Sequence, residues 1–150
     1  WVDAHGEQSS GEVDGLHLRI GKAWAHAGDY AKSLDEFDLS HDGATGAEAW
    51  LLATCPDAKY RDSAKALRLM MEQCAKYRSL GDDAADTLAA AEAGQGDWVK
   101  AVGFERLALL IARGRKHFET AAAKKKTLAD YAARLALYEE KKPSRGIWKW

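Results

Sequence analysis

The chain has 150 residues, of which 47% are hydrophobic and 30% charged, and its formal net charge is −1 at pH 7. That length, with only two prolines, is typical of one mostly helical domain with a buried core. The two cysteines exclude a disulfide framework, and no apolar run approaches the roughly 20 residues that a membrane-spanning helix requires.

Residues 1–14 are polar and rich in Gly and Ser, and they show no hydrophobic period. Such a segment has little to bury, so we expect a linker or a disordered N-terminus there. Because the chain begins with Trp rather than Met, we also expect it to be either a processed chain or a piece of a longer protein, and we favour the second. The two cysteines are interpreted as buried thiols of a reducing, cytoplasmic compartment.

Residues 15–112 contain segments in which two short helices are separated by a break. The first segment, residues 14–46, breaks at Gly28, and another, residues 82–112, breaks at Gly96; an Asp follows each glycine. A Gly at a helix end can take a positive φ, and the Asp after it can cap the next helix. The two glycines are 68 residues apart, which is twice the 34-residue period of a tetratricopeptide array and predicts a middle copy.

The middle copy falls on residues 47–80, where the break has a different composition. Pro56 disfavours helical geometry at the residue before it and cannot donate to a helix, so the first helix should end early. A longer loop should follow, after which Asp62 or Ser63 caps the second helix.

Small residues mark the places where helices should cross closely. Gly21 inside a helix costs about 1 kcal/mol relative to Ala, so close packing is expected there. Ala89 and Ala101 are small enough for the two helices of the last pair to approach. Three tryptophans are expected to fill the core beside these crossings: Trp24, Trp50 and Trp98.

The segments AWLLATCPDAKYRDSAKALRL and DTLAAAEAGQGDWVKAV carry a family resemblance. They resemble the degenerate tetratricopeptide arrays of planctomycete-type bacterial proteins, over residues 16–110. The resemblance implies an all-α fold, a right-handed α-solenoid of about three helix-turn-helix repeats with a C-terminal capping helix. It also implies a non-catalytic module that binds a peptide or a partner domain on its concave face.

The last part of the chain departs from the repeat and is basic. Residues 113–150 hold 11 of the 22 Lys and Arg but only four of the 23 Asp and Glu. Residues 113–142 predict one or two capping helices, with four apolar side chains on one face: Leu128, Tyr131, Leu135 and Tyr138. Residues 143–150 form a basic, aromatic tail. The basic side chains of this last part of the chain are interpreted as a solvated surface rather than a nucleic-acid or lipid site: Lys124, Lys125, Lys126, Lys141, Lys142, Arg145 and Lys149.

The resemblance also indicates which side chains line the groove, since the first helix of each pair faces it. Those residues are Leu18, Lys22, His26, Glu48, Leu51, Lys59, Asp83, Asp86 and Ala90. Two lysines among them are too few to hold a partner's terminal carboxylate, and the aspartates favour a polar or basic protein segment. Charge reversal at Asp83 and Asp86 is expected to weaken capture while helicity stays unchanged.

Catalytic, cofactor and metal sites are not expected. The Asp38-x-x-His41 spacing suits a metal-binding helix, but a second such motif is missing and an acidic solvated face is favoured. Cys55 and Cys74 lack the spacing of zinc ligands, and no base is placed beside either thiol. The glycines around Gln95 lack the Lys-Ser/Thr of a phosphate loop.

A structural role is the alternative to peptide binding. Three hairpins are near the minimum for a stable stack, so the chain could serve as an assembly domain of a larger protein. The tail would then dock on a neighbouring domain or protomer through Ile147, Trp148 and Trp150, which have no helix to bury them.

Overall fold

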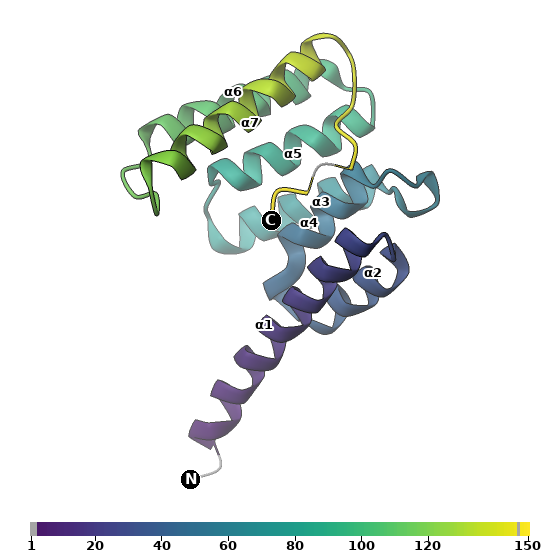
Figure 1. Cartoon of the computed structure of the whole chain (residues 1–150), viewed down its shortest axis with the longest axis vertical. Helices are drawn as coiled ribbons and strands as arrows, with labels where there is room; N and C mark the ends of the chain where they lie inside the picture. Colours follow the sequence, from purple (N-terminus) through teal and green to yellow (C-terminus); the bar gives the residue numbers. More distant parts are fainter. Residues whose placement is uncertain (1–2, 147) are drawn as a thin grey trace.

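All the regular secondary structure in the described part of the chain is helical (Figure 1). The computed structural model describes residues 3–146 and 148–150, with side chains from residue 11 onward apart from residue 42. No strand occurs among these residues. The elements in chain order are α1 (Asp3–Ala27), α2 (Tyr30–Leu39), the 3-10 helix η1 (His41–Ala44), α3 (Thr45–Thr54), the 3-10 helix η2 (Ala58–Tyr60), α4 (Ser63–Tyr77), α5 (Asp82–Gly94), α6 (Trp98–Gly114) and α7 (Ala121–Glu139).

The first six helices form three pairs of neighbours in sequence order. Helix α1 packs on α2, α3 on α4 and α5 on α6, and α5 also contacts both helices of the pair before it. In Figure 1 the pairs follow one another along the long axis, with α7 lying against α6 at the far end. The apolar core is therefore divided among successive pairs.

The glycine breaks have the predicted geometry. Gly28 and Gly96 adopt φ of +82° and +81°, which an L side chain rarely does. The side chains of Asp29 and Asp97 then cap α2 and α6, each accepting a hydrogen bond from the backbone N–H three residues later. The two hairpins are thus built alike, as their shared Gly-Asp pair indicates.

The break in the middle pair also follows the prediction. Helix α3 ends at Thr54, two residues before Pro56, and η2 occupies the loop. Asp62 caps α4 by accepting from Lys65 N at 2.8 Å. Proline therefore sets the end of α3, and an acidic cap starts the next helix.

Close packing at Gly21 is confirmed, and it predicts the effect of a substitution. A Cβ on Gly21 would lie 2.5 Å from Phe37 Cε1, and Ser33 Oγ donates to the Gly21 carbonyl at 2.8 Å. Gly21→Ala should lower the free energy of unfolding by about 1–3 kcal/mol through overpacking, measured by urea denaturation. Gly15→Ala is the matched control, because its Cβ meets nothing within 4 Å in the same helix. Equal stability of the two variants would contradict the close approach.

The three tryptophans expected in the core differ in burial. Trp50 of α3 is fully buried, as predicted. Trp24 and Trp98 are only half-buried, and Trp24 lies under the ammonium of Lys32, 4.3 Å from the ring centroid. The prediction was wrong for these two because Trp24 belongs to the first pair, which no preceding pair covers, and Trp98 begins α6 at the edge of its cluster.

The N-terminus differs from the expectation of a linker over residues 1–14, since α1 begins at Asp3. Glu12 and Val13 are exposed on this helix. Once α1 is held by its packing on α2, further turns add at little cost because only nucleation of a helix is expensive. The polar composition of this segment therefore indicates residues exposed on a helix, not residues outside a helix.

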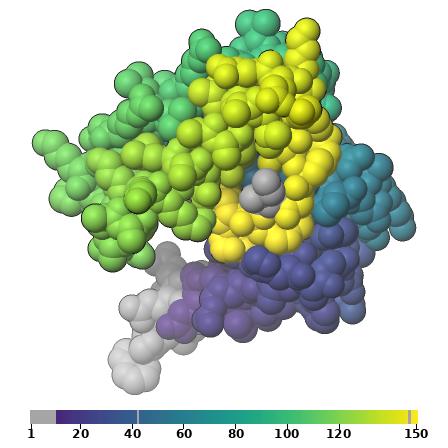
Figure 2. All heavy atoms as spheres, turned by 45° about the horizontal axis from the view of Figure 1, so that its top comes forward, coloured from purple at the N-terminus to yellow at the C-terminus, as the bar shows by residue number. Residues whose placement is uncertain are grey.

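At the other end, α7 presents the predicted apolar face to the stack. Tyr131 and Tyr138 are buried, and Leu128 and Leu135 pack beside Tyr131. After α7 the chain turns back along α5 and ends beside α3 (Figure 1). Figure 2 shows these last residues filling the surface between α7 and the first helix pair.

Candidate binding groove

The C-terminal tail is fixed where it meets the end of α3. Gly146 N donates to the carbonyl of Thr54 at 2.8 Å, and Arg145 Nη1 donates to that of Ala53 at 3.2 Å. These carbonyls belong to the last turn of α3, which has no intrahelical donors left for them. Gly146 turns the chain with φ of +63° against Pro56.

Two tryptophans of the tail form an aromatic stack in the groove. Trp148 and Trp150 have ring centroids 5.5 Å apart and planes inclined by 17°. Trp150 meets Phe37 edge-on at 6.3 Å, and Trp148 contacts Tyr30 at 6.1 Å. Both tryptophans pack against the clusters of the first and second helix pairs, so the aromatic tail that the sequence left unplaced is partly buried on its own chain.

Helix α1 also contacts the end of the tail through polar groups. Lys22 Nζ lies 5.7 Å from the centroid of the Trp150 ring, within the range of a cation–π contact. His26 Nε2 lies 3.3 Å from the carbonyl oxygen of Trp150. A carbonyl only accepts, so this hydrogen bond requires the proton on Nε2.

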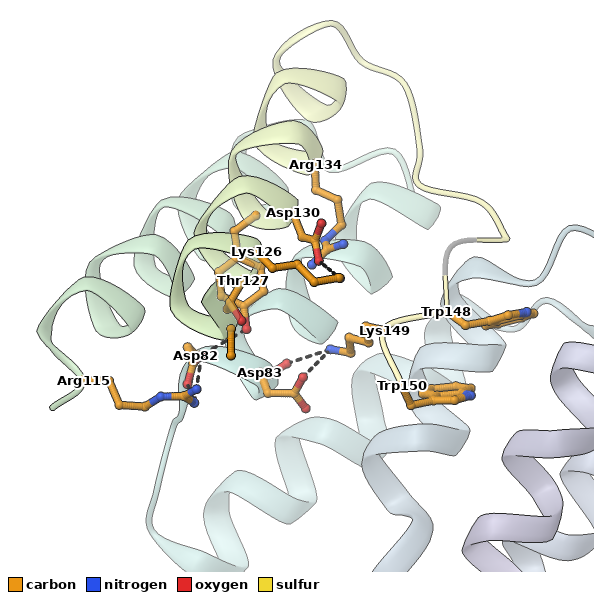
Figure 3. Close-up of a pocket in the computed structure, with 12 residues that line it drawn as sticks. Asp82, Asp83, Arg115, Lys126, Thr127, Asp130, Arg134, Trp148, Lys149 and Trp150 are labelled. Carbon is orange, nitrogen blue, oxygen red and sulfur yellow. Dashed lines mark hydrogen bonds and ion pairs between the residues drawn. The ribbon is translucent and has the colours of Figure 1, made fainter. Parts of the chain in front are cut away.

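Lys149 points the other way, into α5 (Figure 3). Its Nζ donates to Asp83 O at 3.1 Å, to Asp86 Oδ2 at 3.0 Å and to Thr87 Oγ1 at 2.7 Å, and Asp83 Oδ1 lies at 2.9 Å. The ammonium also lies 4.1 Å from the centroid of the Trp50 ring. The side chain is only 12% exposed, so its charge is compensated almost entirely by the protein.

A second cation lies on the far side of the same carboxylate. Arg134 of α7 binds Asp86 through two hydrogen bonds, Nε to Oδ1 at 2.6 Å and Nη2 to Oδ2 at 3.1 Å. Its guanidinium carbon lies 5.2 Å from the centroid of the Trp50 ring. Asp86 and Arg134 are both buried, so α5 and α7 are joined by a buried ion pair that also contacts Lys149.

Glu105 of α6 completes this buried cluster. Its carboxyl is fully buried, and Arg134 Nε is 3.9 Å from its Oε1, too far for a hydrogen bond. Burial and the negative charge of Asp86 raise the pKa of Glu105 to about 9. Glu105 therefore carries a proton at neutral pH, which leaves Asp86 as the buried carboxylate that pairs with the two cations.

Asp82, at the start of α5, binds Arg115 after α6 and Tyr131 one turn before Arg134 in α7. Arg115 Nη1 donates to its Oδ1 at 3.0 Å, and the Tyr131 hydroxyl donates to its Oδ2 at 3.1 Å. A hollow of about 680 Å³ opens beside these groups, between α5, α7 and the tail (Figure 3). Its lining is mixed in charge, and two of the lining residues, Lys126 and Asp130, form an ion pair at 2.6 Å along α7.

The structure brings most of the expected groove residues around the tail. Lys22 and His26 contact Trp150, and Asp83 and Asp86 bind Lys149. Three apolar residues of the expected groove lie in the clusters against which the tail packs: Leu18, Leu51 and Ala90. Ile147, also expected in the docking tail, lies outside the described residues.

Two expected groove residues are placed elsewhere. Glu48 is paired with Lys65 of α4 at 2.7 Å, so its carboxylate is engaged between the helices of its own pair. Lys59 is exposed in η2, beside Tyr60. Lys59 lies outside α3 because Pro56 ends that helix at Thr54, and Glu48 is turned toward α4 by its ion pair with Lys65.

Charge reversal affects the two groove aspartates differently. The Asp83 side chain is 68% exposed, so its reversal leaves the helices undisturbed. Asp86 has no exposed surface and binds Arg134, so its reversal would break a buried ion pair and lower stability. Unchanged helicity is therefore expected on reversal of Asp83 alone.

The other side chains considered for chemistry do not assemble. Asp38 and His41 are exposed, Cys55 is buried and Cys74 half-buried, and burial raises the pKa of both thiols. Among the described residues no three His, Cys, Asp or Glu side chains are placed to hold a metal ion.

Comparison with known proteins does not assign the chain to a family. Scans of protein-family models, of curated proteins and of solved structures find no match to the chain. Within the described part of the chain, each helix is either too short or too polar to cross a membrane. The features that bear on function are therefore the surface that the tail covers and the oxygen atoms that surround Lys149 Nζ.

Proposed function

We propose that this chain is a non-catalytic protein-binding module, a right-handed α-solenoid of three tetratricopeptide-like repeats whose concave face holds an extended peptide. Three features support the proposal: the pairing of the helices in sequence order, the packing of α5 on both helices of the preceding pair, and the Gly-Asp breaks 68 residues apart. Helix α7 then serves as the capping helix that such a stack needs.

The observation that carries the proposal is the tail itself. Residues 148–150 have no helical structure, and they contact α1 through Lys22, α3 through Trp50 and α5 through Asp83. These are the first helices of the three pairs. A non-helical segment thus occupies the face on which a tetratricopeptide-like stack would bind its partner, and this occupancy supports peptide binding there.

Binding in trans tests this proposal. The full-length variant W148A/K149A/W150A should leave the groove free, because the tail loses its stacked rings and its ammonium. A fluorescently labelled peptide of residues 141–150 should bind this variant, measured by anisotropy. It should bind the unaltered chain about tenfold more weakly or worse, since a groove occupied by its own tail is rarely free.

The control variant V99A/L110A removes apolar area from α6 without touching the tail, since Val99 is 85% and Leu110 is 67% exposed. Its affinity for the peptide should equal that of the unaltered chain. The variant W148A/K149A/W150A is called the opened variant. If it keeps its helical circular dichroism and still binds no peptide, the groove is not a binding site.

A structural role is the second candidate, and one observation favours it. The tail contacts all three helix pairs, so it can act as a clasp that holds the stack together within one chain. Under that reading the opened variant would unfold at a much lower temperature and would not regain stability when the peptide is added. Stabilisation by the peptide instead favours the binding module, because a ligand of the folded state raises its stability.

A further inference from the structure

We infer that the pocket around the Lys149 ammonium is a lysine-recognition site, and that the partner of the groove is a segment with an aromatic–Lys–aromatic sequence. This inference rests on the proposed function and specifies its ligand. The argument has three parts: the coordination of the ammonium, the charge of the pocket and the alternation of the tail.

The pocket matches the donors of a lysine side chain. Four oxygens lie 2.7–3.1 Å from Nζ, supplied by the carbonyl of Asp83 and the side chains of Asp83, Asp86 and Thr87. Thr87 Oγ1 donates its own proton to Asp83 O at 2.9 Å, so its lone pairs face the ammonium. A compact group with three rotatable N–H donors fits such a cluster, whereas the planar fork of arginine does not.

The charge of the pocket calls for one cation. Asp83 and Asp86 are negative, Arg134 supplies one positive charge through its paired hydrogen bonds, and protonated Glu105 supplies none. One negative charge therefore remains in this group, and the Lys149 ammonium lies within 3.0 Å of an oxygen of each carboxylate. The ring of Trp50 adds a face that favours a cation 4.1 Å from its centroid. An apolar side chain would leave buried acceptors unpaired at this position.

The two tryptophans that flank Lys149 pack on the side of the tail that faces away from the lysine pocket. Side chains of an extended segment alternate, so Trp148 and Trp150 face one way and Lys149 the other. The two rings stack on each other and pack against Tyr30 and Phe37 of the first helix pair. The groove therefore accommodates a segment in which alternate side chains face opposite sides, with a basic side chain between two aromatic ones.

Peptide variants test the lysine pocket separately from the groove. With the opened variant W148A/K149A/W150A, the 141–150 peptide carrying Lys149→Met should bind at least about tenfold more weakly than the original, and Lys149→Arg should also be weaker. A peptide with Lys142→Met is the matched control, because Lys142 is exposed and pairs with Glu140. Its affinity should be unchanged, and D83K in the opened variant should weaken only the peptides that keep Lys149.

Each outcome decides one of the two proposals. Equal affinity of the original peptide and the peptide carrying Lys149→Met would overturn lysine recognition while leaving peptide binding intact, whereas binding of neither peptide would overturn the proposed function. If the opened variant does not fold, hydrogen exchange of residues 144–150 in the full chain replaces it. Exchange should rise at least about tenfold in K149M, and an unchanged rate would overturn the lysine pocket. Dimers formed by exchange of tails would confirm the same pocket with a second copy as the partner.

Discussion

Replacing Arg134 with Met should lower the free energy of unfolding by about 3–5 kcal/mol, one of the two largest effects expected in this protein. The substitution keeps most of the side-chain volume but leaves the Asp86 carboxylate without its bidentate partner. Asp86 has no exposed surface, so water cannot replace the lost hydrogen bonds. Lys149 still binds Oδ2 at 3.0 Å, which places the expected loss toward the lower end of the range. Urea denaturation followed by circular dichroism measures it.

Arg106→Met provides the matched control for this prediction. Arg106 binds Glu139 of α7 at 2.9 Å, but both side chains are largely exposed. Such pairs contribute about 0–1 kcal/mol, because water and salt screen the attraction. A loss in Arg134→Met no larger than in Arg106→Met would show that the buried pair does not stabilise the junction of α5 and α7.

The second large effect is a dependence of stability on pH that originates at Glu105. Its pKa rises from 4.5 to about 9 on folding, so the folded chain binds more protons than the unfolded chain between these values. The stabilisation is complete below pH 4.5, falls by up to about 1.4 kcal/mol per pH unit, and is lost as pH rises through 9. Unfolding free energies measured from pH 5 to 9 should decrease steadily.

Glu105→Gln assigns this pH dependence to one residue. The amide has nearly the shape of the protonated carboxyl and cannot ionise, so the variant should match the unaltered chain near pH 5 and exceed its stability at pH 9. The other charged groups facing Glu105 remain in both proteins: Asp86, Arg134 and Lys149. An identical pH slope in the two proteins would mean that Glu105 is not the group responsible.

Local rules predicted the helices well because the signals are short-range. The positive φ at Gly28 and Gly96 is a property of a single residue, and Asp62 caps the helix that starts beside it. Gly21 inside a helix indicated a close neighbour, and Phe37 is that neighbour. These features are set within one hairpin, so no knowledge of the distant chain was required.

The buried charges were not predicted, because their partners are distant in sequence. Asp86 and Arg134 are 48 residues apart, and a carboxylate near a helix start is usually explained by the helix dipole. A signal was nevertheless present. Arg134 lies on the same face of α7 as Tyr131 and Tyr138, and Glu105 lies on the face of α6 that carries Ala101. A charged residue on an apolar stripe implies a buried partner, although the sequence does not say which.

The position of the tail could not be derived from the sequence either. Trp148 and Trp150 have no periodic context, and their partners are contributed by the first helix pair, more than 100 residues earlier. Lysine at position 149 indicated only a solvated charge. The groove contacts depend on how three pairs stack, and that arrangement determines which side chains face one another.

The anchor at Arg145 and Gly146 shifts the binding equilibrium against any competitor. Its hydrogen bonds to the end of α3 hold the chain beside the groove even when residues 148–150 leave it. A short tether of this kind gives the departing residues an effective concentration on the order of millimolar. An incoming segment present at micromolar levels therefore needs an affinity about a thousandfold higher, or contacts outside the groove, before it can displace them.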